Sequence, residues 1–472
     1  MKIQFCGAAQ EVTGSSHLIT LDDGYKILLD CGLFQGDIVN IDALNNSFIF
    51  NPKEIDMLIL SHAHIDHCGR VPMLVKHGFK GKIISTHATR DLAAIMMMDT
   101  AHIMERDVQY YNERLGDKKK KNPAYKGVKR EVLYNAQDVV NAVDLFISIS
   151  YDQLNKIEDG IHVLFTDTGH ILGSASVNLR IKRGTDDLRL GFSGDIGRPN
   201  RPILKDPHPM LPSDIIITES TYGDKLHLEK PDETQRFLNI ISETCVKQKG
   251  KVIIPAFSVG RTQEIVHKLD QLVHENKLPK IKVYVDSPLS VNATEIFRAH
   301  PECFDYELHQ YLLKNEDPFG FNSLRYIHDV SESKALNESK EPAVIISASG
   351  MMNAGRIKHH VANNIENARN TILFVGYCSP ETPGGILRNG AKQIKMFGEL
   401  KQVKARIEIL DSFSAHGDQN EMLDFLSNQK NTAQQIFLVH GEAKVMPVYR
   451  EFLMDNGFNN INMPKIGEEV RI

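Results

Sequence analysis

The sequence lacks the features that would place it in a membrane, in the secreted class or among disulfide-bonded proteins. No apolar run approaches the ~20 residues that a membrane helix needs. The opening residues, MKIQFCGAAQEVTG, predict a strand and a turn, not a signal peptide. The six cysteines are scattered with no CxxC pair, which is typical of reduced thiols. A formal net charge of −5 gives no overall basic field, so any nucleic-acid binding must depend on local patches. We therefore expect a cytoplasmic protein with no membrane contact.

The patterning of apolar residues predicts an α/β architecture. At 472 residues the chain is long enough for about two or three domains. Short apolar runs recur along it, each followed by Gly, Ser, Asp or His and often by a helix-like stretch: 56–60, 163–167, 188–192, 214–218, 252–256, 281–285, 343–347, 371–375, 405–410 and 435–440. Strands that alternate with helices are the signature of α/β folds.

One short string combines three histidines and an aspartate. His62, His64, Asp66 and His67 follow directly after the apolar run 56–60. Alternation along a strand puts His62 and His64 on one side, and the turn after them brings Asp66 and His67 to a neighbouring position. Imidazole and carboxylate ligands placed in this way suit two adjacent zinc-like ions. The alternative, a solvated histidine-rich loop, does not explain so dense a set.

Further candidate side chains lie just past other apolar runs. These are Asp30, His170, Asp195 and His440. Each is able to bind a metal or to orient a ligand, and each has a glycine beside it that lets the backbone come close. A single one would more often be a turn residue, but their repeated placement favours a shared site.

Residues 116–130 (GDKKKKNPAYKGVKR) are the one compositional oddity. They carry seven Lys or Arg residues against one acid, Asp117, and are interrupted by Gly and Pro. We expect an exposed loop here. Two interpretations stay open: a solubilising surface loop, and a contact with a phosphate backbone near the active site.

Several motifs in combination resemble the metallo-β-lactamase superfamily and, within it, the β-CASP nucleases. The superfamily motifs are HxHxDH at 62–67, GHILGS at 169–174, SGDIG at 193–197 and LVHGE at 438–442. The β-CASP motifs are TESTYG at 218–223, PAFSVGRTQE at 255–264, SASGMMNAGR at 347–356, FVGYCSPETPGG at 374–385 and DSFSAHGD at 411–418. The likeness covers essentially the whole chain and extends to the subunit that cleaves pre-mRNA 3′ ends and to its bacterial and archaeal homologues.

The resemblance implies an α/β fold in which an αββα metallo-β-lactamase sandwich carries an inserted α/β β-CASP domain. The implied boundaries are 1–220 for the first part of the sandwich, 221–405 for the insert and 406–472 for the return segment. Only 32 residues follow His440, so the additional RNA-binding domains of some relatives are not expected.

The resemblance also assigns roles to the candidate residues. It implies one metal held by His62, His64 and His170, a second held by Asp66, His67 and His440, and Asp195 as the bridge between them. Asp30 would lie behind these ligands and steady the loop that carries the histidines.

His416 would be the general acid and Glu219 would orient it, completing a catalytic set with Asp66 and Asp195. A carboxylate beside a histidine stabilises the imidazolium, which suits protonation of a leaving oxygen. Signals for phosphate contacts are weaker: Ser414, Arg261 and Arg356. The two arginines follow glycine-containing turns that expose backbone N–H groups to anions, and ordinary α/β turns are the alternative.

The function implied is a zinc-dependent ribonuclease with two zinc ions per chain. A hydroxide shared by two divalent ions is available near neutral pH for attack on a phosphodiester. Within the family, a histidine at position 440 goes with members that act on RNA, so single-stranded RNA is the expected partner. Cleavage within the strand is expected, with a 5′-exonucleolytic mode and homo-oligomers left open. The alternatives are a DNA nuclease, a small-molecule metallo-hydrolase and a non-catalytic scaffold.

Overall fold

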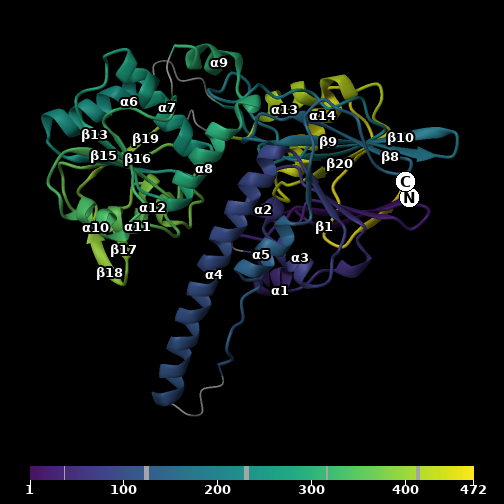
Figure 1. Ribbon diagram of the computed structural model, residues 1–472, viewed down its shortest axis with the longest axis horizontal. Helices are drawn as coiled ribbons and strands as arrows, with labels where there is room; N and C mark the ends of the chain where they lie inside the picture. Colours follow the sequence, from purple (N-terminus) through teal and green to yellow (C-terminus); the bar gives the residue numbers. More distant parts are fainter. Residues whose placement is uncertain (37, 122–126, 228–232, 315–316, 411–414) are drawn as a thin grey trace. The chain divides into compact units, whose positions relative to one another are not determined.

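The chain forms two compact units in the computed structural model, which describes residues 1–472 except 37, 122–126, 228–232, 315–316 and 411–414, and only the backbone of 117–121. Unit 1 consists of residues 1–199, 206–226 and 416–472, and unit 2 of residues 200–205 and 227–415 (Figure 1). The chain leaves unit 1 and later returns to it, so unit 2 is an insertion. This agrees with the predicted α/β sandwich that carries an insert.

Unit 1 contains two seven-stranded sheets, both mixed in strand direction. The first has the order β22-β1-β2-β3-β4-β5-β6, with β1 (Lys2–Gly7), β2 (Ser16–Thr20), β3 (Lys26–Leu29), β4 (Met57–Ile59), β5 (Lys82–Ser85), β6 (Phe146–Ser148) and β22 (Glu469–Arg471). The second has the order β21-β20-β11-β10-β9-β8-β7, with β7 (Asn155–Glu158), β8 (Ile161–Asp167), β9 (Ala175–Arg183), β10 (Asp186–Phe192), β11 (Ile215–Glu219), β20 (Gln435–Val439) and β21 (Ile461–Asn462).

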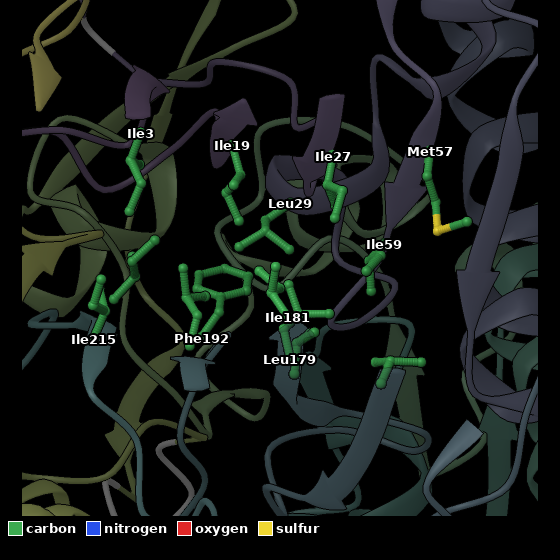
Figure 2. Packing of buried hydrophobic residues seen from close by; sticks show 14 of the residues in the cluster. Ile3, Ile19, Ile27, Leu29, Met57, Ile59, Leu179, Ile181, Phe192 and Ile215 are labelled. Atoms are coloured by element: carbon green, nitrogen blue, oxygen red, sulfur yellow. The ribbon is translucent and has the colours of Figure 1, made fainter. Parts of the chain in front are cut away.

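The two sheets pack face to face around one apolar core. Alternate residues of each strand point inward, because side chains alternate across a strand. Figure 2 shows the core side chains of one sheet meeting those of the other: Ile3, Ile19, Ile27, Leu29 and Ile59 on one side, and Leu179, Ile181, Phe192 and Ile215 on the other. Burial of this interface fixes the strand ends that carry the candidate residues.

Helices cover the outer faces of both sheets. The outward-facing Leu28 and Leu58 of the first sheet are fully buried, and a second cluster packs α13 and α14 on β11 and β20. The helical segments of unit 1 are α1 (Ile41–Asn46), η1 (Pro52–Glu54), α2 (Ile65–Cys68), α3 (Val71–Lys76), α4 (His87–Lys121), α5 (Ala136–Val143), α13 (Gln419–Leu426), η4 (Ser427–Gln429) and α14 (Met446–Asp455). The layers are therefore αββα.

Unit 2 is built on a parallel sheet of order β14-β13-β15-β12-β16-β19. Its strands are β12 (Lys251–Pro255), β13 (Lys282–Val285), β14 (Leu324–Tyr326), β15 (Ala343–Ser347), β16 (Thr371–Phe374) and β19 (Arg406–Ile409), and a hairpin adds β17 (Gln393–Met396) and β18 (Glu399–Gln402). The central strands β12 and β15 are buried at every residue, as expected for a parallel sheet covered on both faces.

The helical segments of unit 2 connect these strands. They are α6 (Glu233–Ile241), η2 (Ser242–Lys247), α7 (Arg261–His274), α8 (Pro288–Ala299), η3 (Pro301–Cys303), α9 (Tyr306–Leu312), α10 (Val330–Glu338), α11 (Ile357–Asn364) and α12 (Pro383–Arg388). An apolar cluster with Ile253, Ile345, Val361 and Phe374 joins α11 to the sheet.

Most expectations for secondary structure are confirmed, and one is wrong. Each of the predicted apolar runs overlaps a strand, and the six cysteines are buried thiols. Within the described parts of the chain, no helix is both long and apolar enough to span a bilayer. The loop expected over 116–130 is wrong for residues 116–121, because α4 continues through Lys121. Lysine is a good helix former, and the single Gly116 does not end the helix.

Candidate metal centre

The HxHxDH string lies where β4 ends and α2 begins. His64 immediately precedes α2, and Asp66 and His67 lie within that short helix. The loop after β3 packs tightly against it: a Cβ on Gly32 would lie 1.6 Å from the carbonyl oxygen of Asp66. Cys31 N–H donates to the carbonyl of His67 at 2.7 Å. A glycine is therefore required at position 32 for the two loops to meet.

The first group of donor atoms comes from His62, His64, His170 and Asp195. His64 Nδ1 lies 3.1 Å from His62 Nε2 and 3.1 Å from His170 Nε2. Asp195 Oδ2 lies 3.5 Å from His62 Nε2 and 3.4 Å from His170 Nε2. All four side chains thus converge on one point.

The second group comes from Asp66, His67 and His440, with the other oxygen of Asp195 beside it. His67 Nε2 lies 3.0 Å from His440 Nε2 and 3.2 Å from Asp195 Oδ1. Asp66 Oδ2 lies 3.4 Å from His440 Nε2. The two carboxylate oxygens of Asp195 therefore face different groups, as a bridging ligand would.

The separations within the first group fit a tetrahedral metal ion. Zinc bonds of about 2.0–2.1 Å put neighbouring ligand atoms about 3.3 Å apart, and the observed N–N and N–O separations run from 3.1 to 3.5 Å. Hydrogen bonds alone do not account for the geometry, because His64 Nδ1 faces two other ring nitrogens and a nitrogen carries at most one proton. Burial lowers the pKa of His64 to about 4 and the pKa of His62 and His170 well below the usual value. Neutral imidazoles are the form that binds divalent ions.

Asp30 is fully buried behind His67. Its Oδ2 accepts hydrogen bonds from His67 Nδ1 at 2.7 Å and from Ser61 Oγ at 2.9 Å, and its Oδ1 accepts from Ser61 N–H at 2.8 Å. A carboxylate on the far ring nitrogen fixes the tautomer and turns Nε2 toward the site.

Other orienting residues were not singled out from the sequence. Thr221 Oγ1 donates to the carbonyl of His440 and accepts from His440 Nδ1, both at 3.0 Å. Thr89 Oγ1 donates at 2.8 Å to the carbonyl of Gly173 in the loop that carries His170. Thr221 lies inside the TESTYG motif, but only the pairing of β11 with β20 shows that it meets His440.

His416 and Glu219 form a pair beside the two groups. His416 Nδ1 lies 3.2 Å from Glu219 Oε2 and 3.9 Å from Asp195 Oδ2. Glu219 is fully buried at the end of β11, and the carbonyl of Ile196 accepts from Gly417 N–H at 2.8 Å, which holds His416 in place. Burial would lower the pKa of His416, but the Glu219 carboxylate raises it to about 9. The imidazolium is thus favoured in the metal-free site.

Of the three weaker phosphate candidates, Arg261 and Arg356 belong to unit 2. Arg261 is buried and pairs with Glu264. Arg356 donates to Asp286 Oδ1 at 2.6 Å and to the carbonyl of His328 at 2.6 Å. Ser414 lies outside the described residues. Their role in phosphate binding stays a prediction.

A second buried polar cluster lies in unit 2. His360 Nε2 donates to Asp286 Oδ2 at 2.6 Å, and His360 Nδ1 lies 2.9 Å from Asn337 Oδ1. Of the adjacent histidines 359 and 360 in α11, His359 is exposed and His360 is fully buried. Asp286 follows β13 just as Asp30 follows β3, so the sequence carries the same signal at both positions.

Comparisons with known proteins agree with these features. Family models match over residues 9–234 (metallo-beta-lactamase superfamily), 262–387 (Beta-Casp domain) and 401–464 (Zn-dependent metallo-hydrolase RNA specificity domain). Ribonuclease TTHA0252 of Thermus thermophilus is 32% identical over 100% of both chains. An RNase J-like protein of Methanocaldococcus jannaschii is 29% identical over 93% of this chain and 92% of its own length. Transcription termination factor FttA of Methanosarcina mazei is 27% identical over 94% of this chain and 67% of FttA.

Proposed function

This chain belongs to the metallo-β-lactamase superfamily and to its β-CASP group, and from that membership we propose how it cleaves RNA. It is a metal-dependent hydrolase of RNA phosphodiester bonds. The finer assignment is that two zinc ions act on single-stranded RNA, within the strand, with 5′-exonucleolytic removal as a second mode. The domain boundaries 1–220, 221–405 and 406–472 and a cytoplasmic location belong to the same proposal.

The proposal assigns seven side chains to the two ions. His62, His64 and His170 would hold one, Asp66, His67 and His440 would hold the other, and Asp195 would bridge them. When bound, such a pair of ions lowers the pKa of water and neutralises charge on the phosphate oxygens. Asp30 holds His67 in the tautomer that presents Nε2 to the site, and Thr221 does the same for His440.

We assign to His416 the donation of a proton to the leaving 3′-oxygen. Its Nδ1 faces Glu219, so Nε2 would be the ring nitrogen that donates to the substrate. Glu219 is buried and cannot turn away, because its carboxylate also accepts from the backbone N–H of Ile196. A fixed carboxylate keeps the imidazole oriented and protonated before the bond breaks, which is what a general acid requires.

One observation carries this function: two groups of facing donor atoms share Asp195, and an imidazole with its own carboxylate lies 3.9 Å from that bridge. A hydrolase acting on a small, good leaving group would not need the separate acid. RNA in place of DNA as the substrate is supported by His440, which lies 3.0 Å from His67 in the second group.

The test is a time course on a single-stranded RNA labelled at its 5′ end, run beside the DNA of matched sequence with wild type and an Asp195→Asn control. Early internal fragments from RNA alone are the expected result. Immediate release of labelled mononucleotide would replace the endonuclease assignment by a 5′-exonuclease. Equal cleavage of DNA would remove the RNA preference, and no cleavage by protein containing two zinc ions would overturn the nuclease mechanism.

A further inference from the structure

The outer half of α4 extends away from the body of unit 1. From His102 to Gly116, every side chain except that of Leu115 is at least partly exposed. Figure 1 shows this half of the helix running beyond α1, α3 and α5, with the returning chain beside it. We call residues 102–121 together with the returning residues 127–131 the basic arm. A helix that makes so little apolar contact is part of the protein surface and does not pack in the core.

The inner end of α4 is fixed beside the first group of donor atoms. Thr86 and Thr89 both donate from their hydroxyls to the carbonyl of Gly173, at 2.7 and 2.8 Å. Gly173 belongs to the loop of His170, whose N–H donates to Ser174 Oγ at 3.0 Å. The helix has 35 residues, which corresponds to a length of about 52 Å at about 1.5 Å per residue. The arm is therefore rigidly connected to the site but ends far from it.

The charge of the arm is opposite to that of the rest of the chain. The arm contains eight Lys or Arg and five Asp or Glu, a net formal charge of +3, whereas the whole chain carries −5, so the remaining residues carry −8. Seven of the eight cations lie in residues 114–121 and 127–130, which contain one acid, Asp117. A polyanion is repelled by most of this protein and attracted to this segment. Residues 116–121 lie at the outer end of α4, so for these residues the expected contact near the active site is wrong.

Aromatic rings lie among the cations of the arm. Tyr110 is 60% exposed, and the guanidinium of Arg114 lies 5.3 Å from its ring centroid. Arg130 lies 4.5 Å from the ring of Tyr111, and its backbone N–H and carbonyl both bond to the Asn112 side chain at 2.9 Å. The returning chain is thus tied along the helix. Exposed rings with cations are the combination on which single-stranded nucleic acids stack.

We propose that the basic arm binds a second stretch of the same single-stranded RNA that is cleaved at the metal centre, so that long RNAs are preferred to short ones. This rests on the proposed function. A stacked strand rises about 3.4 Å per nucleotide, so about 15 nucleotides span the length of α4. At this rise, an RNA of about 6 nucleotides is too short to reach from the metal centre to the end of the arm, whereas one of about 40 nucleotides is long enough.

The experiment compares kcat/KM for those two RNAs in wild type and in a variant with Lys118–Lys121 replaced by Ala, which preserves helix propensity. A matched control replaces four exposed lysines elsewhere in unit 1: Lys53, Lys80, Lys182 and Lys465. We expect the long-to-short ratio of kcat/KM to fall about 10-fold in the arm variant and less than about 2-fold in the control. An unchanged ratio in the arm variant would overturn the proposal.

Binding is measured separately from cleavage, so that failure of the two proposals is distinguishable. Fluorescence anisotropy of the labelled long RNA on Asp195→Asn protein should show weaker binding in the arm variant and a salt slope reduced by about 3, at about 0.7 per lost contact. This result would support the arm even if no RNA were cleaved. If the arm variant instead changed the sedimentation of the free protein and left RNA binding intact, the arm would be a protein contact and the proposal would be wrong.

Discussion

Each unit holds a buried group of histidine and carboxylate side chains beyond the ends of its strands, and the two groups are completed in different ways. In unit 1, ring nitrogen faces ring nitrogen: His64 Nδ1 lies 3.1 Å from His62 and 3.1 Å from His170. In unit 2, ring nitrogen faces oxygen: His360 lies 2.6 Å from Asp286 and 2.9 Å from Asn337.

The difference teaches when such a cluster indicates a metal. The unit 2 carboxylate is satisfied by protein donors, since Asp286 accepts from Arg356 at 2.6 Å, from Ser333 and from His360. The unit 1 group has acceptors that converge on one another, and only a cation satisfies them together. The presence of histidine and aspartate is common to both; the direction in which the lone pairs point separates them.

The largest effect on activity should come from disrupting the group of metal-binding side chains in unit 1, which we call the open cluster. We expect Asp195→Asn to lower RNA cleavage by at least about 10³-fold, because Asp195 is the proposed bridge between both ions and their effect on the barrier is several kcal/mol. Metal content measured by mass spectrometry should fall below two ions per chain. The matched change Asp286→Asn should leave two ions bound. Equal metal loss in both variants would remove the distinction between the clusters.

Disrupting the group around Asp286 and His360 in unit 2, which we call the closed cluster, should instead lower the free energy of unfolding. Burial would raise the pKa of Asp286, but hydrogen bonds from His360, Ser333 and Arg356 lower it below the ordinary value. The stabilisation is therefore present above the unfolded-state pKa of about 4 and is lost as pH falls through the folded-state pKa. We expect Asp286→Asn to cost about 3 kcal/mol at pH 7.

Urea unfolding followed by circular dichroism at pH 7 and near pH 3, below the unfolded-state pKa of about 4, checks this prediction. The difference in unfolding free energy between wild type and Asp286→Asn should shrink at the lower pH. The same cost at both pH values would show that the carboxylate charge is not what stabilises unit 2.

Removing the proposed proton donor separates the loss of the acid from the loss of metal, because the proposed metal ligands stay intact. We expect His416→Ala to lower kcat by at least about 10²-fold while two ions remain bound. Glu219→Gln should cost less, and the double variant should cost little more than His416→Ala, since both act on one proton. Single-turnover cleavage measures these rates; full activity in His416→Ala would remove the acid assignment.

The smallest effect should come from the support of the open cluster. Thr221→Val removes the hydroxyl beside His440 Nδ1 and should weaken binding at the second ion about 10-fold, the lower end for partners of metal ligands. Thr221→Ser, which keeps the hydroxyl, is the control. Competition with a zinc chelator measures the affinity, and identical affinities for the two variants would speak against the orienting role.

The sequence predicts the strands well because buried strands are short apolar runs bounded by turns. The run 281–285, for example, becomes β13 at Lys282–Val285. The HxHxDH string is also local, so its density alone indicates a metal site. The extent of α4 was missed because a lysine run with a glycine is typical of loops, whereas helix propensity favours its continuation.

Contacts between distant parts of the sequence set the limit of such predictions. Thr221 meets His440 across 219 positions, and His360 meets Asp286 across 74. No local sequence pattern predicts either contact, because each contact depends on which strands become neighbours. The same dependence explains why one adjacent histidine pair yields an exposed and a fully buried side chain.

The pairing of β11 with β20 has a consequence for the newly made chain. Ribosomes deliver residues in order, and the donors of the first group all lie before residue 196, whereas the second group requires His440 and the proposed acid is His416. A nascent chain therefore lacks the proposed second ion site and the proposed proton donor until residue 440 has emerged.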